Sequence, residues 1–302
     1  MKAIVLHEYG GPSKLLYEDW DDPTPGEGEV LVMTAATSVN PVDWKIRSGS
    51  AQARFPLELP AILGRDLSGV VRAVGPGVTG IAPGDEIIAL TNRAYAQLVV
   101  VKLTELTKLP AGMDVVQSAA LPLVTLTGEQ LIRRAAKPEK GQTILITGAN
   151  GGVGRSAVRA AKDDGAIVIA GVRKKQMEAA KEIGADEYLA LDDEDAIAKL
   201  GLLDVIADTI GGRLAETLIA KVKPGGVYAS VVAPPANAKL HPTVRIEAFM
   251  AQPDSESLGR LAALVQAGRL HIPIDRMVAL EDAAEAHAAA EKGGLGKILL
   301  LA

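Results

Sequence analysis

Three glycines stand at regular spacing in the stretch "ITGANGGVG", at positions 148, 151 and 154. They follow an apolar, β-branched run and precede a segment with helical spacing, so a strand should turn directly into a helix here. The free N–H groups and the dipole at such a helix start favour an anion, and a dinucleotide pyrophosphate suits them. A structural turn without a ligand is the alternative. We predict a cofactor site formed by Gly148, Asn150, Gly151, Gly152, Val153 and Gly154.

Three cations, Arg173, Lys174 and Lys175, follow the next apolar run, and no acid stands beside them in the sequence. An acid at this point would accept hydrogen bonds from the ribose hydroxyls of NAD. Arginine and lysine instead form charge-assisted hydrogen bonds with a phosphate, and arginine can stack on adenine. The cluster therefore predicts NADP(H) rather than NAD(H). The alternative is a set of solvated cations at a helix start, where the helix dipole disfavours them.

The loop "TSVNPVDWKIRSG" at residues 37–49 crowds Asn40, Asp43 and Lys45 into one turn between apolar stretches. An amide can donate and accept hydrogen bonds, a carboxylate can accept them, and an ammonium can donate them. The loop contains no Cys or His, the whole chain has no Cys, and its four histidines show no ligand spacing. A zinc site is therefore not expected. Whether the loop is an active-site loop or only a polar connection stays open on these residues alone.

The elements around these residues change character along the chain. The first third consists of short β-branched runs separated by Gly and Pro turns, which is typical of an all-β barrel or sandwich. From Gln142 onward apolar strands alternate with helices, which predicts βαβ units and a doubly wound parallel sheet. We place an all-β domain at 1–120, completed by 254–302, and a dinucleotide-binding domain at 121–253.

Composition excludes several classes of function. The chain has 302 residues, 48% of them hydrophobic, and a formal net charge of −5, with no basic run that would bind nucleic acid. No apolar stretch is long enough to span a bilayer, and the N-terminus lacks the features of a signal peptide. With no disulfide to form, the sequence is compatible with a cytoplasmic protein.

Several short motifs occur in an order that is highly specific. They include "SVNPVD", "LGRDLSGVVRAVGPGV", "AALPLVTLTG", "GANGGVG", "DTIGG" and the terminal "GKILLL". In this order the chain resembles the zinc-independent quinone oxidoreductase (zeta-crystallin-like) branch of the medium-chain dehydrogenase/reductase superfamily. The "LGRD" form is also similar to the mitochondrial reticulon-interacting oxidoreductases. The resemblance implies a GroES-like β-barrel catalytic domain, a Rossmann domain and an active cleft between them.

The resemblance also implies roles for individual residues. Asn40 stands where zinc-dependent relatives carry a Cys, and it would lie beside the nicotinamide and the acceptor. Thr127 would contact the nicotinamide carboxamide. Arg65 and Asp66 replace the His and Glu of the zinc-dependent motif, and we expect them to form an ion pair. Asp43 would fix the loop, and Tyr95 would pack within a strand.

Lys45 departs from the branch, because several quinone reductases carry a Tyr there, and a catalytic role for its ammonium is a further hypothesis. The stretch "SGSAQA" lacks the Tyr of enoyl-thioester reductases, which disfavours that activity.

The expected function is hydride transfer from NADPH to a small-molecule acceptor, a quinone, without zinc. Two alternatives stay open: an NADPH-dependent enone or alkenal double-bond reductase, and a weakly catalytic NADPH-binding sensor or structural protein. The resemblance implies a homodimer, formed where an edge strand such as "VYASVVA" pairs across a two-fold axis.

Overall fold

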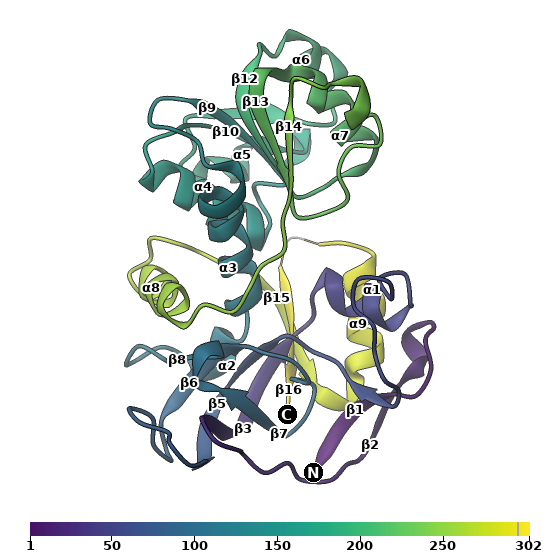
Figure 1. Ribbon diagram of the computed structural model, residues 1–302, viewed down its shortest axis with the longest axis vertical. Coiled ribbons are helices and arrows are strands. Elements are labelled where there is room, and N and C mark those ends of the chain that lie inside the picture. Colours follow the sequence, from purple (N-terminus) through teal and green to yellow (C-terminus); the bar gives the residue numbers. More distant parts are fainter. Residues whose placement is uncertain (295) are drawn as a thin grey trace. The chain divides into compact units, whose positions relative to one another are not determined.

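The computed structural model describes residues 1–294 and 296–302, and these divide into two compact units (Figure 1). The first unit joins Met1–Leu123 to Pro253–Ala302, and the second is Val124–Gln252. The sequence places the two junctions at 120/121 and 253/254, so the two descriptions differ by a few residues. Among the described residues, no helix is both long and apolar enough to cross a membrane.

The first unit is built on short strands in two sheets. The larger sheet has the order β15-β16-β3-β5-β6-β8, with β7 also paired to β3, and the smaller has the order β2-β1-β4. Alternate side chains along β3, β6 and β7 belong to one apolar core, as the period of two along a strand requires, and β1 contributes consecutive residues to it. The predicted β-strand architecture of this part of the chain is confirmed, and helices accompany the strands. Its strands are β1 (Lys2–Leu6), β2 (Leu15–Asp19), β3 (Glu29–Ser38), β4 (Ala61–Ile62), β5 (Asp66–Val74), β6 (Glu86–Leu90), β7 (Leu98–Lys102), β8 (Leu106–Lys108), β15 (Ile274–Ala279) and β16 (Lys297–Leu301).

The C-terminal segment supplies part of this first unit. Strand β16 pairs antiparallel with β3, with Leu299 opposite Ser38, and the Val39 N–H donates to the Ile298 carbonyl over 3.0 Å. This pairing brings the start of β16 beside the loop that follows β3. The helices of the unit are α1 (Pro41–Arg47), α2 (Val115–Ser118), α8 (Ser255–Gln266) and α9 (Ala283–Glu291), and α9 contacts α1 (Figure 1).

The second unit contains a six-stranded parallel sheet of order β11-β10-β9-β12-β13-β14. The chain enters at β9, runs outward to β11, and then returns to the other side of β9, so the order reverses between β9 and β12. This reversal confirms the doubly wound fold, and it is the point where such sheets bind ligands. The strands are β9 (Thr143–Thr147), β10 (Ile167–Val172), β11 (Glu187–Ala190), β12 (Leu203–Asp208), β13 (Val222–Ser230) and β14 (Arg245–Ala248). The helices are α3 (Pro122–Gln130), whose first two residues belong to the first unit, α4 (Gly152–Asp163), α5 (Met177–Ala180), α6 (Glu194–Lys199) and α7 (Gly212–Leu218).

One expectation about this sheet is wrong. The stretch "VYASVVA" was expected at a sheet edge, but β13 pairs with β12 on one side and with β14 on the other. The edge of the sheet on this side is β14, a four-residue strand whose sequence "RIEA" carries little β-strand character. Sequence patterns identify strands but not their order in a sheet, which explains the error.

Candidate functional site

The glycine turn lies between β9 and α4, with Gly151 as the N-cap of the helix. Gly148 has a φ of +64°, which favours glycine. A β-carbon on Gly154 would lie 2.3 Å from the Gly148 carbonyl oxygen and 2.6 Å from the Ala149 Cα atom, so α4 packs directly against the turn. The turn therefore presents the N-terminus of a twelve-residue helix at the reversal point of the sheet.

Polar contacts on both sides hold this turn in place. The buried Asp208 carboxylate at the end of β12 accepts the Thr147 hydroxyl over 2.7 Å and the Ile210 N–H over 3.0 Å. The Thr209 hydroxyl donates to the Thr147 carbonyl over 2.7 Å. The carboxyl ends of β9 and β12 are thereby tied together beside Gly148.

Sequence reasoning missed Arg155, which fixes the turn from the helix side. Its Nε donates to the Asn150 carbonyl over 3.0 Å, and its Nη2 lies 3.4 Å from the Asn150 side-chain oxygen. Asn150 in turn donates its amide to the Gln176 carbonyl over 3.5 Å. Burial lowers the Arg155 pKa below its usual value. A cation in the first turn of a helix is unfavourable because it opposes the helix dipole. This unusual placement is the feature of the sequence that could have identified Arg155.

The cation cluster follows β10, and its surroundings correct one expectation. Arg173, Lys174 and Lys175 are exposed, but Lys174 is not without acidic neighbours. Its N–H donates to the Asp192 carboxylate over 2.6 Å, and its ammonium lies 3.2 Å from the Asp193 carboxylate. Strand β11 runs parallel to β10, so the residues after both strands meet although they are distant in the sequence. Lys174 is therefore partly neutralised.

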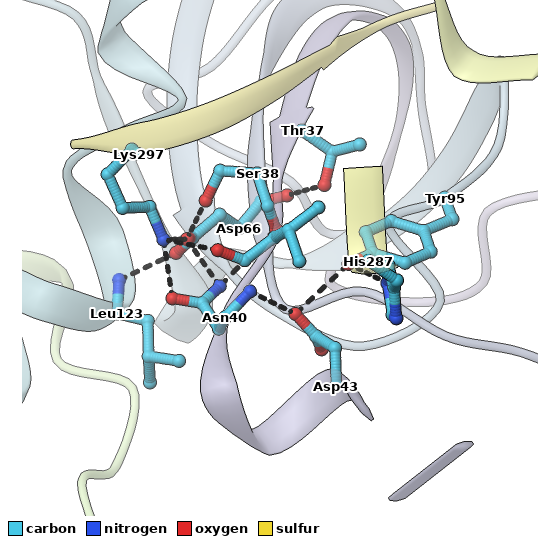
Figure 2. Close-up of polar contacts among 10 residues, drawn as sticks. Thr37, Ser38, Asn40, Asp43, Asp66, Tyr95, Leu123, His287 and Lys297 are labelled. Atoms are coloured by element: carbon cyan, nitrogen blue, oxygen red, sulfur yellow. Dashed lines mark hydrogen bonds and ion pairs between the residues drawn. The ribbon is translucent and has the colours of Figure 1, made fainter. Parts of the chain in front are cut away.

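In the first unit, Asn40 follows β3 and caps α1, and it is fully buried. Figure 2 shows its amide between a carboxylate and an ammonium. The amide nitrogen donates to Asp66 over 2.8 Å and to the Ser38 carbonyl over 3.3 Å, and the amide oxygen lies 2.5 Å from Lys297 Nζ. Both amide hydrogens are thus engaged within the protein. A direct contact of Asn40 with a ligand stays a prediction.

The predicted ion pair between Arg65 and Asp66 is wrong. Asp66 opens β5 with its carboxylate buried, and its cationic partner is Lys297 over 3.2 Å. The carboxylate also accepts the Leu123 N–H over 2.6 Å and the Ser38 hydroxyl. Adjacent residues at a strand start point to opposite faces, which separates Arg65 from Asp66. A lysine opens the apolar run "KILLL", but nothing in the sequence identifies Asp66 as its partner.

A buried series of hydrogen bonds begins at Asp43, as Figure 2 shows. The Asp43 carboxylate accepts the Asn40 N–H over 2.8 Å and the Tyr95 hydroxyl over 3.1 Å. The Tyr95 hydroxyl lies 3.1 Å from His287 Nε2, and His287 Nδ1 lies 3.3 Å from Arg47, which also pairs with Glu291. Asp43 therefore fixes the loop, as expected.

Each hydrogen bond in this series is donated in the same direction, from Arg47 toward Asp43. Arg47 can only donate, so His287 Nδ1 accepts and Nε2 carries the hydrogen toward the Tyr95 oxygen, which leaves the Tyr95 hydroxyl to donate to Asp43. Burial, aided by Arg47, lowers the His287 pKa to about 3, so the ring stays neutral. Burial raises the Asp43 pKa to about 6. Tyr95 lies between β6 and β7 rather than within a strand, which corrects its expected place.

Replacing Tyr95 with phenylalanine should lower the free energy of unfolding by about 1–3 kcal/mol, because a buried carboxylate loses a donor and His287 an acceptor. Urea unfolding measures this loss. The control is Tyr9→Phe, because the Tyr9 hydroxyl has no hydrogen-bond partner in the described part of the chain. Phenylalanine at this position removes no hydrogen bond, so that variant should lose no stability. Equal effects of the two substitutions would contradict the assignment.

Two predicted residues, Lys45 and Thr127, remain to be located. Lys45 is exposed on α1, and Thr127 is buried on α3 in the second unit. The structure thus brings Asn40 together with Asp43, Asp66 and the unpredicted Lys297, and it does not bring Lys45 into that group.

Comparisons with known proteins decide the family. Residues 26–111 match the alcohol dehydrogenase GroES-like domain, and residues 183–300 match a family described as zinc-binding dehydrogenase. A quinone oxidoreductase from Pseudomonas aeruginosa is 32% identical over 310 residues, covering 95% of this chain and 94% of that protein. The chain belongs to the quinone oxidoreductase branch of the medium-chain dehydrogenase/reductase superfamily. It is therefore an oxidoreductase.

Other members of the superfamily agree with this placement. A mitochondrial NAD(P)H oxidoreductase from Mus musculus is 31% identical, covering 88% of this chain and 79% of that protein. The solved quinone oxidoreductase of Coxiella burnetii superposes with a TM-score of 0.91 at 28% identity, over 100% of this chain and 99% of that one. A mycobacterial protein solved in complex with NADPH gives a TM-score of 0.85 at 26% identity, over the full length of both chains.

The description of one matching family implies a zinc ion. The residues of this chain do not fit a zinc site. Zinc sites draw on Cys, His and carboxylate ligands. The chain has no Cys, and the described residues contain no group of three or more His, Cys, Asp or Glu that could share a metal ion. The buried positive charge beside Asn40 and Asp66 is the Lys297 ammonium. We therefore derive no step through zinc.

Proposed function

We propose that this oxidoreductase transfers a hydride from NADPH to a quinone without zinc. The observation that carries the cofactor assignment is the glycine turn, which leads into α4 at the reversal point of the sheet and leaves no room for a β-carbon at Gly154. The NADPH complex of the mycobacterial structural neighbour supports the choice of cofactor. The quinone rests on the names of the relatives from Pseudomonas aeruginosa and Coxiella burnetii.

We propose the following roles for the individual residues. The N–H groups at the start of α4 would hold the pyrophosphate, and Arg173 and Lys175 would bind the adenosine 2′-phosphate. Thr127 would orient the nicotinamide, and Asn40 would shape the site beside it. NADPH, when bound, supplies the hydride. Electron-poor carbonyls need little further activation, so alignment and exclusion of water are the main tasks of the protein.

The test is NADPH oxidation by the purified, chelator-treated protein. A benzoquinone, a polycyclic quinone and an α,β-unsaturated ketone are compared in parallel, with NADH and a zinc-supplemented sample as controls. Turnover of the quinones with NADPH, unchanged by zinc, supports the proposal. Turnover of the ketone alone would make the protein a double-bond reductase. NADPH binding without any turnover would leave the sensor or structural alternative.

Arg173→Ala should raise the KM for NADPH about tenfold, because one charge-assisted hydrogen bond to the 2′-phosphate is lost, and should leave the KM for NADH nearly unchanged. Lys174→Ala is the matched control. Its ammonium already lies 3.2 Å from Asp193, so the effect should be smaller. Steady-state kinetics with both cofactors measure the ratio. An equal rise for NADPH and NADH in Arg173→Ala would argue against a phosphate contact.

A cytoplasmic homodimer is part of the same proposal. The sheet edge at β14 offers backbone groups that a second copy of the chain can pair with, and two-fold symmetry is the commonest arrangement. Light scattering coupled to size-exclusion chromatography tests the dimer, and a monomer at micromolar concentration would reject it.

A further inference from the structure

Lys297 is the first residue of β16, and its side chain is only 10% exposed. The ammonium nitrogen lies 2.5 Å from the Asn40 amide oxygen and 3.2 Å from the Asp66 carboxylate (Figure 2). It also lies 3.2 Å from the Val39 carbonyl oxygen. An ammonium has three N–H donors and no acceptor, and three oxygens surround it here. The charge is therefore held in a small oxygen cage within the first unit.

One of these oxygens belongs to the Asp66 carboxylate, whose burial requires a compensating positive charge. Asp66 is fully buried, and a buried carboxylate is strongly unfavourable unless a cation and hydrogen bonds compensate it. Its remaining partners, the Leu123 N–H, the Ser38 hydroxyl and the Asn40 amide, are neutral. Lys297 is the ion-pair partner that the structure shows for it.

Lys297 and Asp66 together decide how the Asn40 amide points. The ammonium can only face the amide oxygen, and the carboxylate can only face the amide nitrogen. The reverse orientation would set the NH₂ group against the ammonium and the oxygen against the carboxylate. The orientation of the Asn40 side chain, at the N-cap of α1, thus depends on a charge contributed by the last strand of the chain.

We propose that Lys297 is a positioning residue for the Asn40 loop, and that its ammonium is a built-in cation in a family whose description implies a metal ion. The part that concerns turnover rests on the proposed function, because Asn40 is expected to shape that site. The structural part does not depend on it. The ammonium supplies charge and orientation, and it contacts no reacting atom in this assignment.

Chemical rescue tests the proposal. Lys297→Ala removes three methylenes and the ammonium, and n-propylammonium replaces those atoms, whereas 1-propanol is a matched ligand without the charge. We expect Lys297→Ala to lower the melting temperature by about 10 °C, as breaking a buried ion pair in a chain of this size should. Added n-propylammonium should recover at least half of that loss, and 1-propanol should recover little.

Further variants separate charge from packing. Lys297→Met keeps most of the side-chain volume but no charge, so it should lose stability as Lys297→Ala does, while the exposed control Lys102→Ala should not. In the quinone assay, kcat should fall about tenfold in Lys297→Met, because the Asn40 loop is misplaced. The KM for NADPH should stay within about twofold of the wild-type value, because the cofactor site is intact. Propylammonium should restore kcat in Lys297→Ala.

Three results would overturn the proposal. A melting temperature and kcat of Lys297→Met equal to those of the wild type would show that the charge is dispensable. Equal recovery with propanol and with propylammonium would show that only packing matters. Stoichiometric zinc in the wild-type protein, lost together with activity on chelation, would show that a metal is the cation. The melting experiments need no substrate, so they decide the structural part even when the wild type fails to reduce quinones.

Discussion

Gly154→Ala should weaken NADPH binding by about 100-fold or more and destabilise the second unit by about 3 kcal/mol. The new β-carbon would lie 2.3 Å from the Gly148 carbonyl oxygen and 2.6 Å from the Ala149 Cα atom. Both are backbone atoms, so a rotamer change cannot relieve the clash and α4 must move away from the turn. The N–H groups expected to hold the pyrophosphate belong to that helix start, and they would move with it.

Calorimetric titration with NADPH, together with urea unfolding, measures both effects. The matched control is Gly201→Ala in the same unit, because a β-carbon there meets nothing within 4 Å and its backbone is not left-handed. That variant should bind NADPH as the wild type does. NADPH binding by Gly154→Ala within a few-fold of the wild type would contradict the role assigned to the glycine turn.

The wild type should lose about 3 kcal/mol of stability as the pH rises, at about 1.4 kcal/mol for each unit by which the Asp43 pKa is raised. Asp43→Asn should not show this loss. Burial raises the Asp43 pKa from 3.8 to about 6, so the folded chain keeps a proton that the unfolded chain has already released between these two pH values. The stability that Asp43 contributes is therefore fully present below about pH 4 and is lost as the pH rises through 6. Asparagine cannot ionise, and its amide oxygen can still accept the Asn40 N–H.

Urea unfolding of both proteins from pH 4 to pH 7 gives the difference in stability at each pH. The wild type should lose stability relative to Asp43→Asn across this range, with the steepest change between pH 4 and pH 6. The exposed carboxylate Glu27 provides the control, because Glu27→Gln should leave the pH dependence unchanged. Parallel curves for the wild type and Asp43→Asn would show that Asp43 is not the titrating group.

The sequence alone determined the features that depend on local pattern. Short β-branched runs separated by Gly and Pro turns predicted the β-rich part of the first unit, and strands alternating with helices predicted the parallel sheet. The glycine turn could be located because strand, turn and helix are contiguous in the chain, and because Gly154 must lack a side chain whatever else surrounds it. These signals depend on neighbours within a few residues, so no knowledge of the tertiary structure was needed.

The tertiary structure decided which distant residues meet. Asp66 pairs with Lys297, 231 positions away, instead of the adjacent Arg65. Asp192 and Asp193 reach Lys174 because β10 and β11 are parallel neighbours, and β13 is internal because β14 covers its edge. Strand order depends on the combined packing and hydrogen bonding of many elements, and no short stretch of sequence carries that information. A buried charge has to be matched wherever the fold brings its partner, and for that reason the central cation of the candidate site became visible only in three dimensions.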